Sequence, residues 1–185
     1  MFTIDKHKLK FSHKFNEPIC RNIIEIIKGN NITEIIFGWD FNQLIDNLPN
    51  GIKNIIFCSY YYDLPIDNLP NTIELIKLSK YFDHPLDNLP DSIHTIYFGE
   101  YFNQRLDNLP ISIKNLYFPI TGQFNRKFYN LPENLEILVL PRNYSKRFDN
   151  VPNSMIKLNV HNNYPHFNDL KKIVPKREIL NYYNF

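Results

Sequence analysis

Apolar and polar positions along the chain repeat about every 20 residues between residues 41 and 152. One half of each unit ends in a short alternation: in the third unit, Ile96 and Phe98 lie on one side and Thr95 and Tyr97 on the other, which is the pattern of a β-strand. The other half shows no helical period, and its prolines favour extended backbone and turns. The pattern therefore predicts one short strand per unit and a helix-poor return path.

Six copies of this unit carry a motif that ends in Asn-Leu-Pro or Asn-Val-Pro. The copies are FNQLIDNLP (41–49), YDLPIDNLP (62–70), FDHPLDNLP (82–90), FNQRLDNLP (102–110), FNRKFYNLP (124–132) and YSKRFDNVP (144–152). Their final prolines stand 21, 20, 20, 22 and 20 residues apart. A repeat of this length is typical of a solenoid, whose coils stack into one continuous core and fold as a unit. Solenoids present long surfaces, so binding of a macromolecule is the expected function.

The solenoid is predicted to consist of a cap, an array of repeats and a second cap. Residues 1–31 form the expected N-terminal cap with a degenerate first repeat, as a hairpin or a short helix near Asn22–Lys28; residues 32–160 form the repeats. Residues 161–185 form the C-terminal cap, with a short helix over Phe167–Val174. Pro175 and the Tyr182–Phe185 tail are then expected to cover the last coil.

Composition and charge narrow the function classes. The 185 residues carry a net charge of +2 with acids and bases interspersed, so nucleic acid is not an expected partner. No apolar run approaches the ~20 residues of a membrane helix, and the first residues lack the apolar core of a signal peptide. The two cysteines, Cys20 and Cys58, are far apart, which favours a reducing compartment. We expect a cytoplasmic protein.

The repeated phrase resembles the FNIP repeat, a relative of the leucine-rich repeat. The resemblance covers residues 32–160 and is closest in the segments Phe41-Asn42-Gln43, Phe102-Asn103-Gln104, Leu89-Pro90-Asp91-Ser92-Ile93 and Leu109-Pro110-Ile111-Ser112-Ile113. It implies a leucine-rich-repeat-like, mainly β solenoid with one parallel strand per coil of about 20–22 residues. The family is abundant in social amoebae and in giant DNA viruses of amoebae, which would place a viral member in the host cytoplasm. Some members carry an F-box, which implies a link to ubiquitin-dependent targeting.

Outward strand positions are the expected contact surface for a protein partner. The candidates are Ile56, Leu75, Lys77, Thr95, Tyr97, Asn115, Tyr117, Ile137 and Val139. A contiguous exposed apolar patch indicates an interface, and tyrosine is a favoured anchor. Two alternatives stay open: strands favour β-branched and aromatic residues in any case, or a terminal segment covers the face. We expect a monomer that binds a host or cellular protein.

Three further columns of side chains recur at the return path and coil corner. The first is an amide ladder expected to satisfy turn backbone: Asn47, Asn68, Asn88, Asn108, Asn130 and Asn150. The second is a row of carboxylates before these amides, expected to face water or form Asx turns, with cation binding as the alternative. The third, of Tyr60, Tyr61, Tyr81 and Tyr101 with Trp39 in the first coil, is expected to pack half-buried along one edge.

Catalytic and metal-binding motifs are missing from the sequence. The six histidines show no metal-ligand spacing, and there is no H-E-x-x-H, CxxC, P-loop, G-x-S-x-G or dinucleotide fingerprint. We therefore expect no enzyme, no cofactor and no metal. A structural component of a virion or self-associating assembly is the alternative, and an enzyme acting on polysaccharide is a remote one.

Overall fold

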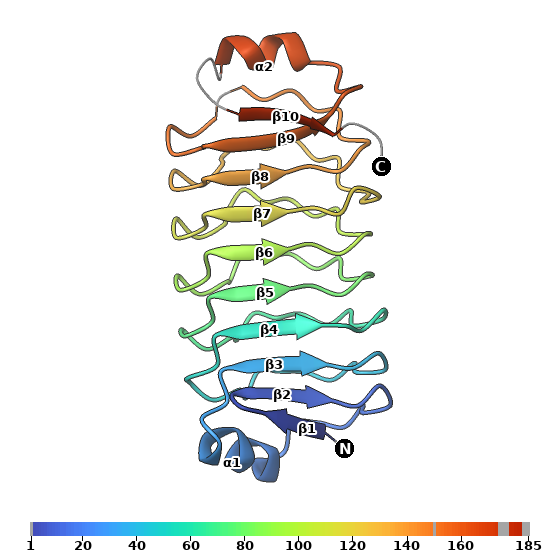
Figure 1. The fold of residues 1–185 in the computed structure, drawn as a ribbon, viewed down its shortest axis with the longest axis vertical. Coiled ribbons are helices and arrows are strands. Elements are labelled where there is room, and N and C mark those ends of the chain that lie inside the picture. Colours follow the sequence, from blue (N-terminus) through green and yellow to red (C-terminus); the bar gives the residue numbers. More distant parts are fainter. Residues whose placement is uncertain (1, 150, 174–177, 183–185) are drawn as a thin grey trace.

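The computed structural model describes residues 2–149, 151–173 and 178–182, and it is an elongated stack of coils (Figure 1). One ten-stranded sheet runs along its whole length, with the strands in chain order. The elements are β1 (Phe2–Asp5), β2 (Lys8–Phe11), α1 (Arg21–Gly29), β3 (Glu34–Phe37), β4 (Asn54–Phe57), β5 (Leu75–Lys77), β6 (Thr95–Tyr97), β7 (Asn115–Tyr117), β8 (Ile137–Val139), β9 (Lys157–His161), α2 (Phe167–Ile173) and β10 (Glu178–Tyr182).

The parallel strands of the repeats pair position for position. Ile76 lies opposite Ile55 in β4 and Ile96 in β6, so equivalent residues of successive units form a column. Every strand from β2 to β10 is parallel to its neighbour, and only β1 is antiparallel, as the outer arm of a hairpin with β2. This register confirms the predicted solenoid with one strand per coil.

A column of aromatic rings occupies the core behind the sheet. The rings belong to the aromatic residue that opens each unit: Phe15, Phe41, Tyr62, Phe82, Phe102, Phe124, Tyr144 and Tyr164. Neighbouring rings are nearly parallel, with centroids 6.0–6.4 Å apart, and all eight are buried. Since each coil supplies one layer to a shared stack, the aromatic position recurs because the fold requires it.

The parallel stack extends beyond residues 32–160 at both ends. At the N-terminus, β2 pairs in parallel with β3, and both of the expected cap elements occur, the β1–β2 hairpin and α1 (Figure 1). At the other end α2 is followed by β10, a further parallel strand that the pattern analysis did not predict. The expected cover by Pro175 and by residues 183–185 lies outside the described residues.

Candidate functional site

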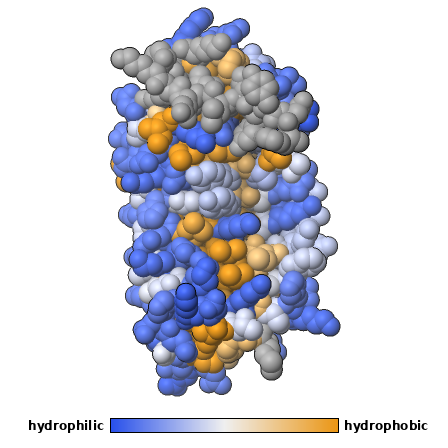
Figure 2. Space-filling model, in the orientation of Figure 1, coloured by the Kyte–Doolittle hydropathy of each residue, from blue (hydrophilic) through white to orange (hydrophobic). Residues whose placement is uncertain are grey.

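The outward face of β4–β8 carries the residues predicted to meet a partner. Figure 2 shows apolar side chains gathered along the middle of this face. Ile56, Leu75, Ile137 and Val139 are half-buried there, and Tyr97 is 37% exposed. The structure therefore brings the predicted apolar positions onto one surface, in the alternating arrangement that a strand imposes.

Two tyrosines form the centre of this face. The rings of Tyr97 and Tyr117, on adjacent strands, stack with their centroids 4.6 Å apart and their planes 12° from parallel. Burial, together with the neighbouring Tyr97, raises the pKa of Tyr117 above its ordinary value. The pair is an aromatic platform that offers both the apolar area of its rings and the hydrogen-bonding capacity of its hydroxyl groups.

The polar candidates on the same face differ from one another. Lys77 is exposed and interrupts the apolar surface. Thr95 is only 8% exposed, and its Oγ1 accepts a hydrogen bond of 3.1 Å from Asn115 Nδ2. Contrary to expectation, Thr95 therefore offers little surface to a partner.

The predicted amide ladder is exposed and connects coils in a different way. Asn88 Nδ2 donates to Asp67 Oδ1 at 3.3 Å, and the equivalent bond one coil later joins Asn108 to Asp87 at 3.1 Å. Asn88 and Asn108 therefore bridge to the carboxylate of the preceding coil, whereas satisfaction of turn backbone was the expected reason for their recurrence. Asn47 does contact backbone as expected, since its Nδ2 donates to the backbone oxygen of Ile19. Asn150 lies outside the described residues.

A second ladder, not predicted from the sequence, lies one residue after the aromatic core position. At each step a side-chain oxygen accepts a hydrogen bond from the backbone N–H of the equivalent residue in the next coil. The members are Asn16, Asn42, Asp63, Asp83, Asn103, Asn125 and Ser145, with bonds of 2.8–3.3 Å. The recurrence of Asn, Asp or Ser after each aromatic residue was the available signal. This ladder satisfies backbone donors that face the gap between coils.

The tyrosine row at the coil corner forms a stack that is more exposed than expected. The Tyr61–Tyr81 and Tyr81–Tyr101 ring centroids are 5.5 and 4.6 Å apart, and Tyr61 is 68% exposed. Lys80 Nζ lies 5.8 Å from the centroid of Tyr101 and 3.1 Å from the carboxylate of Glu100. The tyrosines of this row therefore stack on one another and lie beside a lysine.

Among the described residues, no group of three or more His, Cys, Asp or Glu side chains is arranged to hold a metal ion. In the same part of the chain, no helix has the length and apolar character needed to cross a membrane.

Comparison with known proteins agrees with this geometry. The FNIP Repeat family matches residues 25–57, 44–81 and 82–120, which together make up just over half of the chain. No curated protein matches. A solved structure described as "the crystal structure of CroV588 a novel circular LRR protein structure" is similar, with a TM-score of 0.70 and 28% identity over 88% of this chain. The chain spans 28% of the length of that protein. The matched repeats and the shared coil architecture show that the chain belongs to the FNIP repeat family, with a leucine-rich-repeat-like fold.

Proposed function

We propose that the chain is a non-catalytic protein-interaction scaffold that binds a host or cellular protein through the outward face of β4–β8. The observation that carries the proposal is the stacked Tyr97–Tyr117 pair, set among half-buried apolar residues on neighbouring strands. Membership of a repeat family with a leucine-rich-repeat-like fold supports the same class of function. The link to ubiquitin-dependent targeting remains a prediction from the family resemblance.

The physical case rests on rigidity and on the kind of side chain presented. Parallel strands hold successive outward residues about 4.8 Å apart, so a partner meets a surface that loses little conformational freedom on binding. Truncating a tyrosine that acts as a binding hot spot costs about 2 kcal/mol or more. Because the two rings stack on each other, their effects are not summed, and removing both should weaken binding by about thirtyfold or more, at about 1.4 kcal/mol for each factor of ten.

The test compares proteins captured from host-cell lysate by three immobilised chains: wild type, the double variant Tyr97→Ala/Tyr117→Ala, and Tyr61→Ala. Tyr61 is the matched control, because it is an exposed, stacked tyrosine of the coil corner and not of the sheet face. We expect a set of proteins that wild type and Tyr61→Ala capture and the double variant does not. Thermal melting checks that both variants remain as well folded as the wild type.

Each other outcome has a defined meaning. Identical captured sets for all three chains would contradict a binding role for the sheet face. Capture of the chain itself and nothing else would favour the assembly alternative. Ubiquitin-ligase subunits within the face-dependent set would support the targeting link.

A further inference from the structure

The first half of the repeat changes its charge along the solenoid. The second and third positions after the aromatic core residue carry no lysine or arginine in the first three units, where they are Gln43, Leu44, Leu64, Pro65, His84 and Pro85. In the last three units the same positions are Gln104 followed by five bases: Arg105, Arg126, Lys127, Lys146 and Arg147. The coils of the first three units form without bases there, so the fold does not require this charge.

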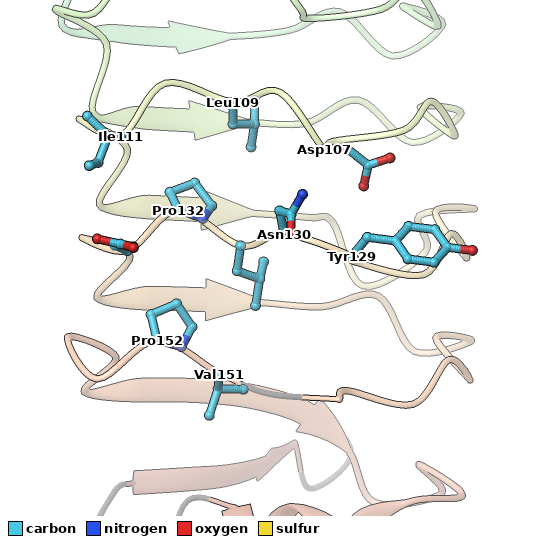
Figure 3. Close-up of a pocket in the computed structure, with 10 residues that line it drawn as sticks. Asp107, Leu109, Ile111, Tyr129, Asn130, Pro132, Val151 and Pro152 are labelled. Carbon is cyan, nitrogen blue, oxygen red and sulfur yellow. The ribbon is translucent and has the colours of Figure 1, made fainter.

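The acidic positions nearby change in the opposite sense. The residue directly after the aromatic core residue is a carboxylate in the second and third units and neutral in the last three: first Asp63 and Asp83, then Asn103, Asn125 and Ser145. Tyr129 stands where the other five units have Asp. In Figure 3, Tyr129 and Asp107 lie on neighbouring coils, at the same end of the return path. The first half of the fifth unit therefore carries two bases and no carboxylate.

Side chains of these coils line one open depression of about 580 Å³. Arg105, Arg126, Lys127 and Lys146 line it together with Tyr129 and two asparagines, and no described carboxylate does so. We call it the basic depression. Its position on the return path separates it from the tyrosine pair of the sheet face.

The bases of the basic depression differ in how far their charge is compensated. Lys127 Nζ forms a 2.7 Å ion pair with Asp149, and Arg105 Nε lies 3.9 Å from Asp107 Oδ2. Arg126 and Lys146 form no ion pair with a described residue. An anion that enters the basic depression therefore meets two cations that are not already paired with a carboxylate there.

Contacts within the solenoid hold these bases in position. Arg126 Nε donates a 3.0 Å hydrogen bond to the backbone oxygen of Asn103 in the preceding coil, which leaves the two terminal nitrogens of the guanidinium as a fork. The guanidinium carbon of Arg105 and the Nζ of Lys127 lie 5.5 and 5.3 Å from the centroid of the Tyr129 ring. Side chains ordered in advance lose less conformational freedom when a ligand binds.

We propose that the basic depression binds a phosphoserine or phosphothreonine in an extended segment of a partner protein. The terminal nitrogens of Arg126 donate to two phosphate oxygens, and the ammonium of Lys146 donates to the third. A phosphate monoester carries nearly two negative charges and three strong acceptors, and the planar fork of arginine matches two of them. A carboxylate offers fewer of both, so the basic depression selects the phosphorylated segment.

A single phosphate fits this surface better than a long polyanion does. The five bases belong to three successive coils, which span about 10 Å at about 4.8 Å per coil. A nucleic acid strand that continued along the return path would meet Asp63 and Asp83 in the coils before them, where its phosphates would be repelled. The net charge of +2 also gives the chain no extended basic footprint.

The experiment is an NMR titration of the isotope-labelled full chain with acetyl-Gly-Ala-phosphoserine-Ala-Gly-amide. The matched probes carry serine or glutamate in place of phosphoserine. We expect the phosphopeptide to shift the Arg126 Nε–H signal and to bind at least about tenfold more tightly than the serine peptide, with the glutamate peptide between them. This titration tests the basic depression alone, because it does not involve the tyrosine face.

Two variants in the basic depression test the assignment. Arg126→Gln introduces the residue that stands at this position as Gln104, whose Nε2 keeps the bond to the preceding coil at 2.9 Å; it should weaken the phosphopeptide about tenfold. Tyr129→Asp restores the carboxylate of the other five units and should weaken binding at least as much by repulsion. Lys28→Gln is the control, because it removes one charge from an exposed position of α1 and should leave the affinity unchanged.

Several results would overturn the proposal. They are equal binding of the phosphoserine and serine peptides, wild-type affinity in Arg126→Gln, an equal loss in Lys28→Gln, and shifts that map to the sheet face. Tighter binding of a short single-stranded oligothymidylate with the same shifts would also overturn it, since the site would then belong to a nucleic acid. Thermal melting confirms that the variants are folded.

Discussion

Tyr62 carries a hydroxyl group that its position in the core does not use. Its ring stands in the aromatic column between Phe41 and Phe82, with centroids 6.1 and 6.4 Å away. The residue is fully buried, and its hydroxyl oxygen has no hydrogen-bond partner. Removing this oxygen in Tyr62→Phe keeps the ring stack and produces the residue found at both neighbouring positions.

The expected gain follows from the missing hydrogen bond. A buried polar group without a partner costs about 1–3 kcal/mol, so Tyr62→Phe should raise the free energy of unfolding by about 1 kcal/mol at pH 7. For a chain of this length that corresponds to a rise of roughly 2–4 °C in Tm. Urea unfolding followed by far-ultraviolet circular dichroism measures the difference.

The gain should also depend on pH in a defined direction. Burial, and after it the charge of Asp46, raises the pKa of Tyr62 well above its ordinary value. In the folded chain the phenol therefore stays neutral, whereas in the unfolded chain it ionises above a pH of about 10. Below that pH the group adds no pH dependence, and above it wild type loses stability, by about 1.4 kcal/mol at pH 11. The variant has no such group, so its advantage should widen between pH 8 and pH 11.

The control is Tyr61→Phe, at the adjacent but exposed position, which should change the free energy of unfolding by less than about 0.5 kcal/mol. Equal or lower stability of Tyr62→Phe at pH 7 would refute the reasoning. An advantage that does not grow at alkaline pH would do the same.

Two further predictions concern contacts between coils. Asp83→Ala removes the acceptor of the Asn103 backbone N–H at 2.8 Å, a solvent-exposed bond, and should cost about 1 kcal/mol in urea unfolding. Asp87→Ala removes an exposed bond between two side chains and should cost less than about 0.5 kcal/mol, because no backbone donor loses its partner. Equal losses would contradict the role of the ladder that includes Asp83. Gly99→Ala should lower the free energy of unfolding by about 3 kcal/mol, because the added Cβ would overlap the backbone of the preceding coil. The control Gly29→Ala has open space around the added Cβ and should leave Tm unchanged. If Gly99→Ala is as stable as wild type, the coils can separate to accept the methyl group.

Much of the scaffold was predictable because the repeat links local pattern to long-range register. Alternation around Ile96 assigns the inward side of one strand, and the 20-residue period places Ile76 and Leu116 opposite it. β10 escaped prediction because its pairing with β9 follows a helix and is not part of the repeated phrase.

The candidate surfaces were predictable only in part. The outward position of Tyr97 follows from alternation, but its stacking on Tyr117 and the cover over Thr95 depend on how side chains lie across strands. The amide of Asn88 was recognised as recurrent, yet its partner is a carboxylate 21 residues earlier. Such a partner becomes evident only when one coil is placed on another.

By itself, the sequence determined the period, the inward and outward sides of each strand and the family of repeats, since all three depend on residue types at regular spacing. The tertiary structure decided which recurring polar residues join coils and which apolar side chains of the return path stay only partly buried. It also decided that Asp107 Oδ1 is buried without a hydrogen-bond partner. The physical reason is that hydrogen bonds between coils and cavity walls depend on the offset of one coil against the next. A change of two residues in spacing alters that offset without disturbing the repeated pattern.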